Sequence, residues 1–587
     1  MLEFYSENER LDLPDEIEVN LTFENPFLSQ DRIPFTYSIP FNLPATSTNM
    51  RKFKHPKRLA SIGSWDAISS FIRFNGITFS QGSLTLTEVE KTLSTSYLGV
   101  LANDLVKKMM NGLSAVVDFF YSFGSGSRLN PDFDTGWANL YKNTIDANSK
   151  DIGIKFAACP VRIQNEQWYG ESASFGNYNA TKLYLNMWNV SNGSYLFTDA
   201  AEPVHGVIYP QPYIHYLFAK VFGDALNVNF FSDNSELKTL CMLTTYHKMY
   251  SDYIMSHYQG ILIDNPSGTA DNYMYLNSFF NKYAFNNFLK DILKMFCCSL
   301  IPRSDGKVDI IHNQSILEST DIIDWSDKLV GSPNISIEKG KRYDYGYQSE
   351  ITGSEDEYHP LLDSIDELLL GTTAPGIYQI STTGEIYEKV DESSYKLLSS
   401  NLGGNTSQAD DDVESFNMNS ASKPISMKVD EYWWLNSNII RGNWYIPEFP
   451  GAGDRYKNDS APYLAFNRGY YNLIQKVTET SPAGYISRYP LLTPYVRDMA
   501  GNKVGNYSLA WEGPDGLIAK FHSGYKAYVE KDKHILKGNF LLTELDLKNI
   551  NYEKKYHVRG MNYFVEKIEV ILKKKSISLA RVKLVES

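Results

Sequence analysis

Residues that could perform chemistry are scattered in this sequence and match no catalytic or cofactor-binding motif. It contains no GxxxxGK[ST] loop, GxGxxG turn, HExxH helix or GxSxG elbow, so the signatures of phosphate, dinucleotide, zinc-protease and serine-hydrolase sites are missing. His247 and His257 are too far apart for one turn of a helix, and no cysteine completes a zinc set around them. We therefore expect no enzyme activity, no cofactor and no metal site.

Acidic residues allow two other kinds of site, a glycan-cleaving active site and a calcium site. The 69 Asp and Glu residues include enough carboxylates for the acid and base of a glycan-cleaving enzyme, and the segment 111–206 could hold such a domain. Asp410, Asp411 and Asp412 are adjacent. A calcium loop needs alternating oxygen ligands and a glycine, so these three residues are more typical of a solvated charge run.

The cysteines indicate buried thiols rather than a disulfide or a metal site. There are four, at Cys159, Cys241, Cys297 and Cys298, and none forms a CxxC pair. Cys297 and Cys298 lie in an apolar helical pattern over 285–300, where neighbouring residues do not readily bond to each other. We expect reduced thiols, with this pair packed on the inner face of the helix, as suits assembly in a reducing cytoplasm.

The composition indicates a β-rich protein of several domains with large contact surfaces. Of the 587 residues, 43% are hydrophobic, 14% are aromatic, and 41 are tyrosine. The net charge of −13 argues against wrapping of duplex DNA, which needs clustered basic residues, although DNA could pass through an acidic lumen. The first residues do not resemble a secretory signal, and no apolar run reaches membrane-spanning length.

The N-terminal part predicts strands. Apolar residues alternate over 17–23, which indicates a half-buried strand that ends at Asn25–Pro26. In the next segment, 32–49, prolines at three positions remove ladder donors. They are Pro34, Pro40 and Pro44. This segment is expected to be an edge strand or an extended arm, and we favour an arm that contacts another subunit.

Turn residues and helical periods organise the centre of the chain. Asn75–Gly76 and Gln81–Gly82 predict two successive hairpin turns. Helices are expected at 214–222 and at 285–296, the second followed by a hairpin with Asp305–Gly306 at its tip. By contrast, 401–423 has few apolar residues and is expected to be a mobile loop.

The last part of the chain predicts a helix followed by a small antiparallel sheet. Four apolar or aromatic residues recur at spacings of three and four over 516–530, which places them on one helix face. They are Ile518, Phe521, Tyr525 and Tyr528. Strands follow from 535 onward, with Thr543 capping a short turn between them. We expect the sheet to cover the aromatic helix face and Lys526 to lie on the opposite face.

Three segments resemble the tail hub, or baseplate hub, proteins of tailed phages and prophages of Bacteroidetes-type bacteria. They are 38–49, which reads SIPFNLPATSTN, 285–311, an aromatic helix before a hairpin, and 506–565. In the last segment the matching residues are Asn506, Tyr507, Leu509, Trp511, Gly513, Gly516, Leu517, Leu545, Leu547, Tyr552, Val558, Gly560, Tyr563 and Val565. These are structural positions, and the three segments occur in the order found in the family.

The resemblance implies an α+β, β-rich multidomain fold, in which small antiparallel β-barrels of the tail hub type are interspersed with helices. It implies a structural virion protein, assembled in the host bacterial cytoplasm, that joins the tail tube to the tip or baseplate as a homotrimer. Three copies with two similar barrels each would match a six-fold tube. The residues expected at assembly contacts are Pro34, Pro40, Pro44, Asn49, Phe521 and Tyr525.

An alternative is a receptor-binding or glycan-degrading tail tip protein. It is suggested by the density of aromatic residues within 111–206, which could form a sugar-binding face, although aromatics at this density more often form cores and subunit contacts. These residues are Trp168, Tyr169, Tyr178, Tyr184, Trp188 and Tyr195.

Composition shifts along the chain divide it into five expected units. They are an N-terminal arm and first β-barrel (1–110), an Asn- and Tyr-rich insertion (111–206), a second hub module of a helix and hairpins (207–352), a loop-rich β insertion (353–460) and the C-terminal helix and antiparallel sheet (461–587).

Overall fold

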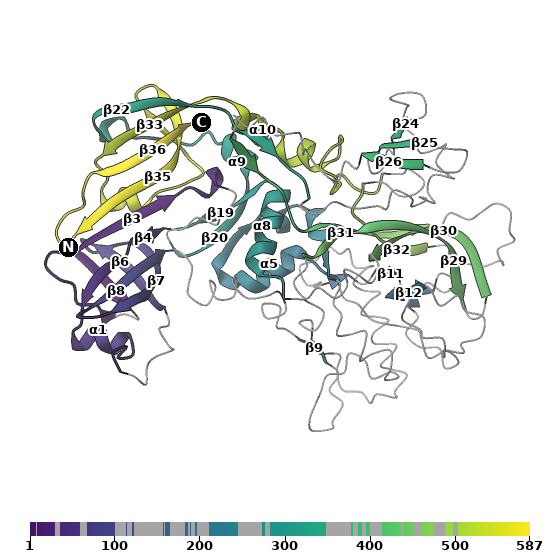
Figure 1. Cartoon of the computed structure of the whole chain (residues 1–587), viewed down its shortest axis with the longest axis horizontal. Helices are drawn as coiled ribbons and strands as arrows, with labels where there is room; N and C mark the ends of the chain where they lie inside the picture. Colours follow the sequence, from purple (N-terminus) through teal and green to yellow (C-terminus); the bar gives the residue numbers. More distant parts are fainter. Residues whose placement is uncertain are drawn as a thin grey trace.

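Figure 1 shows a computed structural model of the chain, which is rich in β-strands and has few helices. The β-rich class expected from the sequence is confirmed. The structure describes residues 1–6, 9–29, 36–58, 67–99, 211–244, 282–303, 305–347, 414–435, 438–449, 461–472, 488–496 and 503–587, with Leu113 and short strands within 120–195, 273–275 and 377–399. The five units stay predictions.

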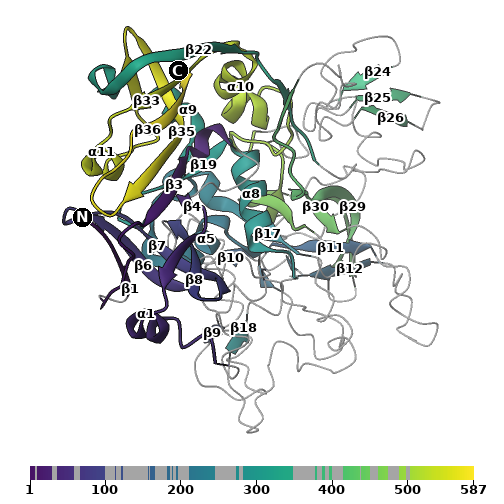
Figure 2. The same cartoon turned by 60° about the vertical axis from the view of Figure 1, so that its left-hand side comes forward.

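Strands from both ends of the chain form one large sheet. Its N-terminal strands are β1 (Leu2–Ser6), β2 (Glu9–Arg10), β3 (Glu18–Glu24), β4 (Tyr37–Ser38), β5 (Phe41–Pro44), β6 (Ile68–Phe74), β7 (Ile77–Val89) and β8 (Thr92–Gly99). Its later strands are β21 (Ile322–Asp324), β22 (Leu329–Glu338), β33 (Lys533–Phe540), β34 (Lys555–Val558), β35 (Met561–Lys573) and β36 (Ala580–Glu586). The strand order is β2-β1-β6-β7-β8-β4-β3-β35-β36-β33-β22, while β5 pairs with β8 and β34 pairs with both β21 and β35. Figure 2 shows the two groups side by side.

The two groups join where β3 pairs with β35. Residues of β3 pair antiparallel with 567–573, and Val19, Leu21 and Phe23 are buried, which confirms the predicted half-buried strand. Ion pairs from Asp15 to Lys574 and from Glu18 to Lys573 flank this junction. The N-terminal part of the sheet is therefore held by strands that come more than 500 residues later in the sequence.

One of the two hairpin turns predicted near the N-terminus forms. Asn75 and Gly76 connect β6 to β7 with positive φ angles of 49° and 83°, the conformation that an Asn-Gly hairpin turn requires. The second prediction is wrong, because Gln81 and Gly82 lie inside β7. Gly82 is needed there for another reason: a Cβ atom would overlap the carbonyl oxygen of Leu98 on the adjacent strand β8.

The central part of the chain repeats a unit of one helix followed by one strand. In the first copy, α5 (Ile214–Phe222) ends at Gly223 with a φ of 53° and leads to β16 (Leu226–Asn229). In the second, α8 (Phe285–Met295) leads to the hairpin of β19 (Cys298–Pro302) and β20 (Val308–His312), with Gly306 at its tip. The strands pair in the order β16-β20-β19. The predicted helices and hairpin are confirmed.

The remaining elements lie around the large sheet and around this centre, and the larger ones are labelled in Figure 1. The helical segments are η1 (Pro26–Leu28), α1 (Ser47–Lys52), η3 (Gly223–Ala225), α6 (Phe230–Asp233), η4 (Leu237–Thr239), α9 (Asn313–Leu317), η6 (Ser326–Lys328), the π-helix η8 (Ile518–His522), α10 (Ser523–Glu530) and α11 (Glu544–Lys548). Strands outside the large sheet include β17 (Leu240–Leu243), β28 (Lys423–Pro424), β29 (Ser426–Leu435), β30 (Asn438–Phe449), β31 (Tyr463–Asn472) and β32 (Arg488–Thr493). Short pairs are β9 (Phe120–Ser122) with β18 (Tyr273–Tyr275), β10 (Phe156–Ala157) with β15 (Gln211–Pro212), β13 (Trp188–Asn189) with β14 (Ser194–Tyr195), and β23 (Arg342–Asp344) with β27 (Ser415–Asn417). Five more strands are described. β11 (Val161–Gln164) and β12 (Lys182–Leu185) lie beside β30, and β24 (Ile377–Gln379), β25 (Ile386–Lys389) and β26 (Tyr395–Ser399) form a separate sheet.

Two separate cores are buried. One lies on the inner face of the large sheet and contains, for example, Phe4, Leu21, Leu536 and Leu584. The other surrounds α5 and α8 in the centre. The C-terminal helix, η8 followed by α10, packs mainly into the central core. The sheet covers only part of its aromatic face: Phe564 of β35 contacts Tyr528, whose hydroxyl donates to the backbone oxygen of Glu586 at 3.1 Å. Other apolar side chains of the C-terminal strands lie in the core that they share with the N-terminal strands, so the expectation holds only in part.

Part of the segment expected to be a mobile loop is packed. Met418, Ser420 and Ser422 are buried between β27 and β28. The carboxylate of Asp291 on α8 accepts hydrogen bonds from the amides of Ala421 and Ser422, at 3.0 Å each, and from the Ser422 hydroxyl at 2.8 Å. Polar groups of this segment, at Ala421 and Ser422, therefore donate hydrogen bonds to a buried carboxylate. Residues 401–413, including the three adjacent aspartates, lie outside the described residues.

Candidate assembly site

The predicted assembly residues occupy two distant places in the fold. Pro34 lies outside the described residues. Pro40 is exposed before β5, and Pro44 ends β5, which pairs only with β8 among the described strands. The edge strand among the two expected alternatives is thus present at 41–44. Contact of these prolines with another subunit stays a prediction.

Asn49 organises its own chain. It lies in α1, and its side chain is fully buried. The amide nitrogen donates to the backbone oxygens of Asp12 and Pro44, at 2.9 Å each, and the amide oxygen accepts from the backbone nitrogen of Asp12 at 3.0 Å. Thr46 caps this helix. These bonds fix the turn after β5 against the residues that follow β2.

Phe521 and Tyr525 lie in the central core rather than beside Asn49. The ring centroid of Phe521 is 5.2 Å from that of Phe296 and 4.9 Å from that of Tyr507. The ring of Tyr525 lies 5.2 Å from Phe27, and its hydroxyl donates to the Phe27 backbone oxygen at 2.5 Å. These two aromatic residues therefore anchor the C-terminal helix to the segment after β3 and to the end of α8.

The same helix begins with a π-helical turn that carries a fully buried histidine. His522 is bonded at both ring nitrogens: Nε2 donates to the Met295 backbone oxygen at 2.9 Å, and Nδ1 accepts from the Tyr343 hydroxyl at 2.8 Å. Burial lowers the pKa of His522 to about 3, because the charged ring would lose its hydration. The imidazole is therefore neutral at physiological pH and acts as a rigid connector between α8, β23 and η8.

Stability is expected to fall on acidification because of His522. In the unfolded chain this group binds a proton near pH 6.5, whereas the folded protein does not until about pH 3. Between these values the unfolded state binds more protons, so the free energy of unfolding falls by about 1.4 kcal/mol per pH unit as pH decreases. His522→Gln, which can keep both contacts, is expected to flatten the dependence of the urea midpoint on pH between 6.5 and 4. An unchanged slope in the variant would contradict this origin.

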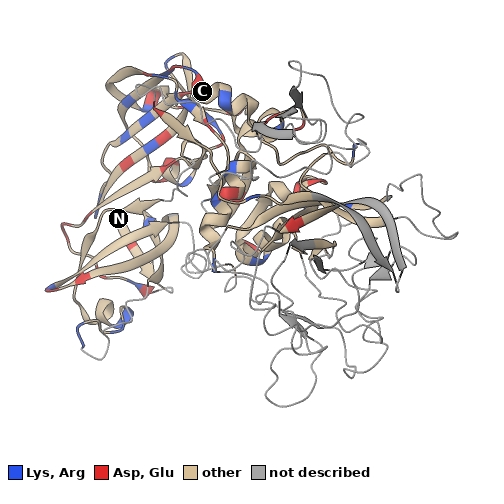
Figure 3. Cartoon of the chain, turned by 45° about the vertical axis from the view of Figure 1, so that its right-hand side comes forward, with Lys and Arg blue, Asp and Glu red and all other residues tan. Residues whose placement is uncertain are grey.

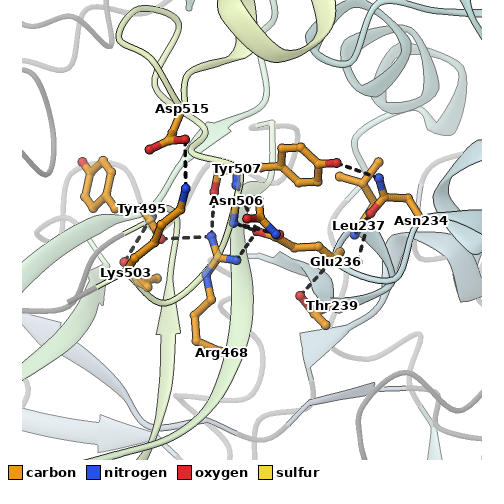
Figure 4. Close-up of polar contacts among 11 residues, drawn as sticks. Asn234, Glu236, Leu237, Thr239, Arg468, Tyr495, Lys503, Asn506, Tyr507 and Asp515 are labelled. Carbon is orange, nitrogen blue, oxygen red and sulfur yellow. Dashed lines mark hydrogen bonds and ion pairs between the residues drawn. The ribbon is translucent and has the colours of Figure 1, made fainter.

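A buried ion pair holds the segment before the C-terminal helix (Figure 4). Arg468 on β31 has a side chain only 2% exposed, and its Nη1 lies 2.6 Å from Oε1 of Glu236. Its Nη2 donates to the backbone oxygens of Tyr495 and Tyr507, at 3.0 and 2.7 Å. Gly505 leaves room for the guanidinium, since a Cβ atom there would overlap it. Arg468 thereby binds Tyr495 and Tyr507 to the central core.

Glu236 completes this cluster from the other side. Its carboxylate accepts from the backbone nitrogens of Asn506, at 2.8 Å, and of Tyr507, at 3.0 Å, as well as from the Asn506 side chain. Asn234 donates to the hydroxyl of Tyr507 at 2.9 Å. The cluster joins three segments that lie far apart in the sequence, and Nε of Arg468 is the one buried donor in it without a hydrogen-bond partner among the described residues. Its geometry is that of a structural clasp.

The four thiols are free and buried, as predicted, but two of them are not on a helix. Because α8 ends at Met295, Cys297 lies in a turn with a φ of 50° and Cys298 starts β19. Burial raises the pKa of the thiols of Cys159, Cys241, Cys297 and Cys298. Thiolate, the reactive form, is therefore suppressed.

We expect the native protein not to react with a thiol reagent such as 5,5′-dithiobis(2-nitrobenzoate). Reaction of all four thiols should follow unfolding in urea, because only then do the groups reach solvent and ionise normally. Reducing agent should leave the unfolding midpoint unchanged. Rapid modification of one thiol in the folded protein would contradict the buried placement.

Both basic and acidic residues occur along the strands of the large sheet (Figure 3). Within the described residues, no group of three or more His, Cys, Asp or Glu side chains could hold a metal ion. None of the helices in that part of the chain is long and apolar enough to cross a membrane. His247, His257 and the side chains of the aromatic residues listed for 111–206 lie outside the described residues.

Exposed apolar side chains mark a different surface. Seven of the eleven large apolar side chains that are exposed among the described residues belong to β21, β22, the segment that follows β33 and the first residue of β35. They are Ile322, Val330, Ile335, Ile337, Leu541, Leu545 and Met561. Hydrogen bonds connect these elements: Leu541 donates its amide to the Lys328 carbonyl, and Arg559 donates its amide to the Ser326 hydroxyl. The surface over β21 and β22, here called the apolar rim, is the candidate assembly site.

Sequence reasoning missed the residues that shape this architecture. Arg468 interrupts an apolar strand, and a charged residue in such a strand is a signal of a buried ion pair. Asp291 similarly lies within the apolar pattern of α8. Apart from Tyr283, which donates to Asp291 from eight residues away, their partners are distant in sequence and could not be identified from spacing. The apolar rim could not be predicted from the sequence, because an alternating apolar pattern in β22 is the same whether its apolar face is covered by other residues or exposed.

Comparison with protein-family models and with curated proteins found no match to this chain. Among solved structures, the 43 kDa tail protein of prophage MuSo2 from Shewanella oneidensis aligns with a TM-score of 0.32 and 7% identity, over 100% of this chain and 98% of that chain. A tail protein from Neisseria meningitidis MC58 aligns with a TM-score of 0.29 and 8% identity, over 100% and 96%. Both neighbours are tail proteins. Scores this low carry no argument about the fold or function of this chain.

Proposed function

We propose that the protein is a structural component of a phage tail, of the hub type, which joins the tail tube to the tip or baseplate as a homotrimer. In this role it contributes contact surfaces and a rigid frame, and DNA passes it through a lumen. The protein would be assembled in the bacterial cytoplasm and reside in the virion. Small barrels of the hub type, one of them built around the large sheet, would form the ring that meets the tube.

The observation that carries this proposal is the apolar rim. Monomeric soluble proteins seldom leave large apolar side chains gathered on one surface, and such patches mark contacts with other proteins. The rim lies on a frame tied together by buried groups, since Arg468, His522 and Asn49 each connect distant segments. The sequence resemblance in the three segments supports the choice of a tail hub among assembly proteins.

The proposal is tested by labelling purified particles. A tag at the C-terminus, detected by gold in electron micrographs, should lie where the tail tube meets the tip. The isolated protein should sediment with three times the 66.8 kDa mass of the chain. A monomer that binds cell-surface glycan and labels the distal fibres would favour the receptor-binding alternative, and absence of the protein from particles would overturn the proposal.

A further inference from the structure

Basic residues are concentrated in one short segment, 51–58, although the whole chain has a net charge of −13. Five of its eight residues are Lys or Arg, and none of the residues from 47 to 58 is acidic. The five are Arg51, Lys52, Lys54, Lys57 and Arg58. Figure 3 shows basic residues at the end of α1 and in the turn that follows it. This segment is here called the basic turn.

The backbone of the basic turn is held in one conformation. Phe53 is 6% exposed and belongs to the core of the large sheet, and Pro56 is buried as well. Lys54 and His55 both have a φ of 54°, which is uncommon for residues other than glycine. The amide of Arg58 donates to the carbonyl oxygen of His55 at 3.0 Å. The buried side chains thus fix the turn, and its basic side chains extend from a defined surface.

Ion pairs leave part of the positive charge without a partner. Glu9 of β2 binds both Arg51 and Lys52, so one carboxylate faces two cations, and the side chain of Arg51 stays 63% exposed. Lys57 and Arg58 are exposed, and neither forms an ion pair within the part of the chain that the structure describes. The basic turn therefore keeps a net positive charge that a polyanion can neutralise.

Three kinds of polyanion could bind there: an anionic membrane, an acidic protein or a nucleic acid. Segments that bind membranes place apolar side chains beside the basic ones, whereas Phe53 and Pro56 of the basic turn are buried. Duplex DNA carries one negative charge per about 1.7 Å of its axis, so a few unpaired cations suffice for contact. DNA is also the polyanion that the proposed function brings to this protein. The chemistry of the turn thus favours DNA.

We propose that the basic turn contacts the phosphate backbone of duplex DNA without sequence preference. This inference rests on the proposed function, since it takes the DNA to be the genome that passes through the tail. Lys and Arg bind phosphates without reading base edges. The acidic remainder of the chain repels DNA, which restricts the contact to the turn. Non-specific contacts of this kind have dissociation constants of about 10⁻⁴ to 10⁻⁶ M at physiological salt, so the DNA can still move past the protein.

The isolated protein tests the contact directly. A fluorescently labelled duplex oligonucleotide of arbitrary sequence is titrated with the protein at about 50 and about 200 mM salt, and its anisotropy is measured. Binding is expected at the lower salt concentration. Its affinity should fall with a slope of about −2 to −4 in a double-logarithmic plot, since each neutralised phosphate contributes about 0.9. No binding at the lower salt concentration, or binding independent of salt, would overturn the proposal.

Charge reversal locates the contact on the protein. Lys57→Glu combined with Arg58→Glu is expected to weaken binding at least about tenfold, whereas Lys57→Arg combined with Arg58→Lys keeps both charges and should bind normally. The matched control is Lys537→Glu with Lys548→Glu, at exposed residues of β33 and α11. It changes the net charge equally and should weaken binding less than about threefold. Equal losses in the two charge-reversed variants would overturn the proposal, because overall charge would then explain the binding.

Two further probes distinguish the other partners. Labelled poly-L-glutamate and vesicles of phosphatidylcholine with phosphatidylserine are offered at the same salt concentration. Binding of either that equals the binding of DNA would overturn the assignment to DNA.

Purified particles separate this inference from the proposed function. If the protein is found in particles and does not bind DNA in isolation, only this inference is overturned. If it binds DNA through the basic turn and is absent from particles, the contact stands and the proposed function fails.

Discussion

Replacing Arg468 with methionine is expected to lower the free energy of unfolding by about 3–5 kcal/mol, because one partner of a buried ion pair is removed. Glu236 would keep its charge without the guanidinium that lies 2.6 Å away. The carbonyl oxygens of Tyr495 and Tyr507 would lose their donor as well. The backbone at Tyr495 and Tyr507 should then detach from β31, and the C-terminal helix should lose this support.

Chemical denaturation with urea measures this effect, and a nearby ion pair provides the control. Lys503 lies 3.4 Å from Asp515 and is about half exposed. Lys503→Met removes a surface pair in the same region and should change stability by less than about 1 kcal/mol. Arg468→Met with stability equal to that of Lys503→Met would show that the clasp is not needed for the fold.

Phe521→Ala is expected to cost about 3–5 kcal/mol, the usual effect of removing a buried aromatic ring. The ring contacts Phe296, Tyr507 and Phe230, which come from three different segments. Truncation leaves a cavity at the point where these segments meet, since the surrounding aromatic rings cannot all move inward. Under the proposed function, this variant should yield tails that stop at the hub.

The control for Phe521 lies on the exposed side of the same helix. Ser523 is exposed, and its substitution by alanine should change the unfolding midpoint by less than the equivalent of about 0.5 kcal/mol. Lys526, expected from the sequence to lie free on the opposite face, is less suitable, because its ammonium lies 5.4 Å from the centre of the Tyr345 ring. Equal stability of the Phe521 and Ser523 variants would show that the ring is not part of the core.

Local elements were predictable because short-range signals determine them. The Asn75–Gly76 turn and the helix that stops at Gly223 each depend on a few adjacent residues. Thr543 forms a capping box with Asp546 at the start of α11, as its position in the sequence indicated. The prediction of a turn at Gly82 failed because it also used only adjacent residues. Glycine occurs both in turns and where two strands approach closely, and the position of the neighbouring strand is needed to tell these two cases apart.

Long-range partners could not be predicted. Alternation in 17–23 shows which face of the strand is buried, but it does not show that β35 is the neighbour. Likewise, the aromatic stripe of the C-terminal helix correctly predicted that Phe521 and Tyr525 are buried. It assigned the cover to the strands that follow, whereas most of the cover comes from α8 and the segment after β3, and β35 contributes Phe564. A hydrophobic face carries no information about which surface it meets.

The pairing of β3 with β35 has a consequence during synthesis on the ribosome. At about 5–20 residues per second, β3 waits roughly half a minute to two minutes before its partner is translated. During that time β3 lacks the strand with which it pairs along its whole length in the folded protein, and it presents this free edge to other nascent chains. Folding should therefore be post-translational and depend on a chaperone that holds the N-terminal strands, and slowing translation should increase aggregation rather than reduce it.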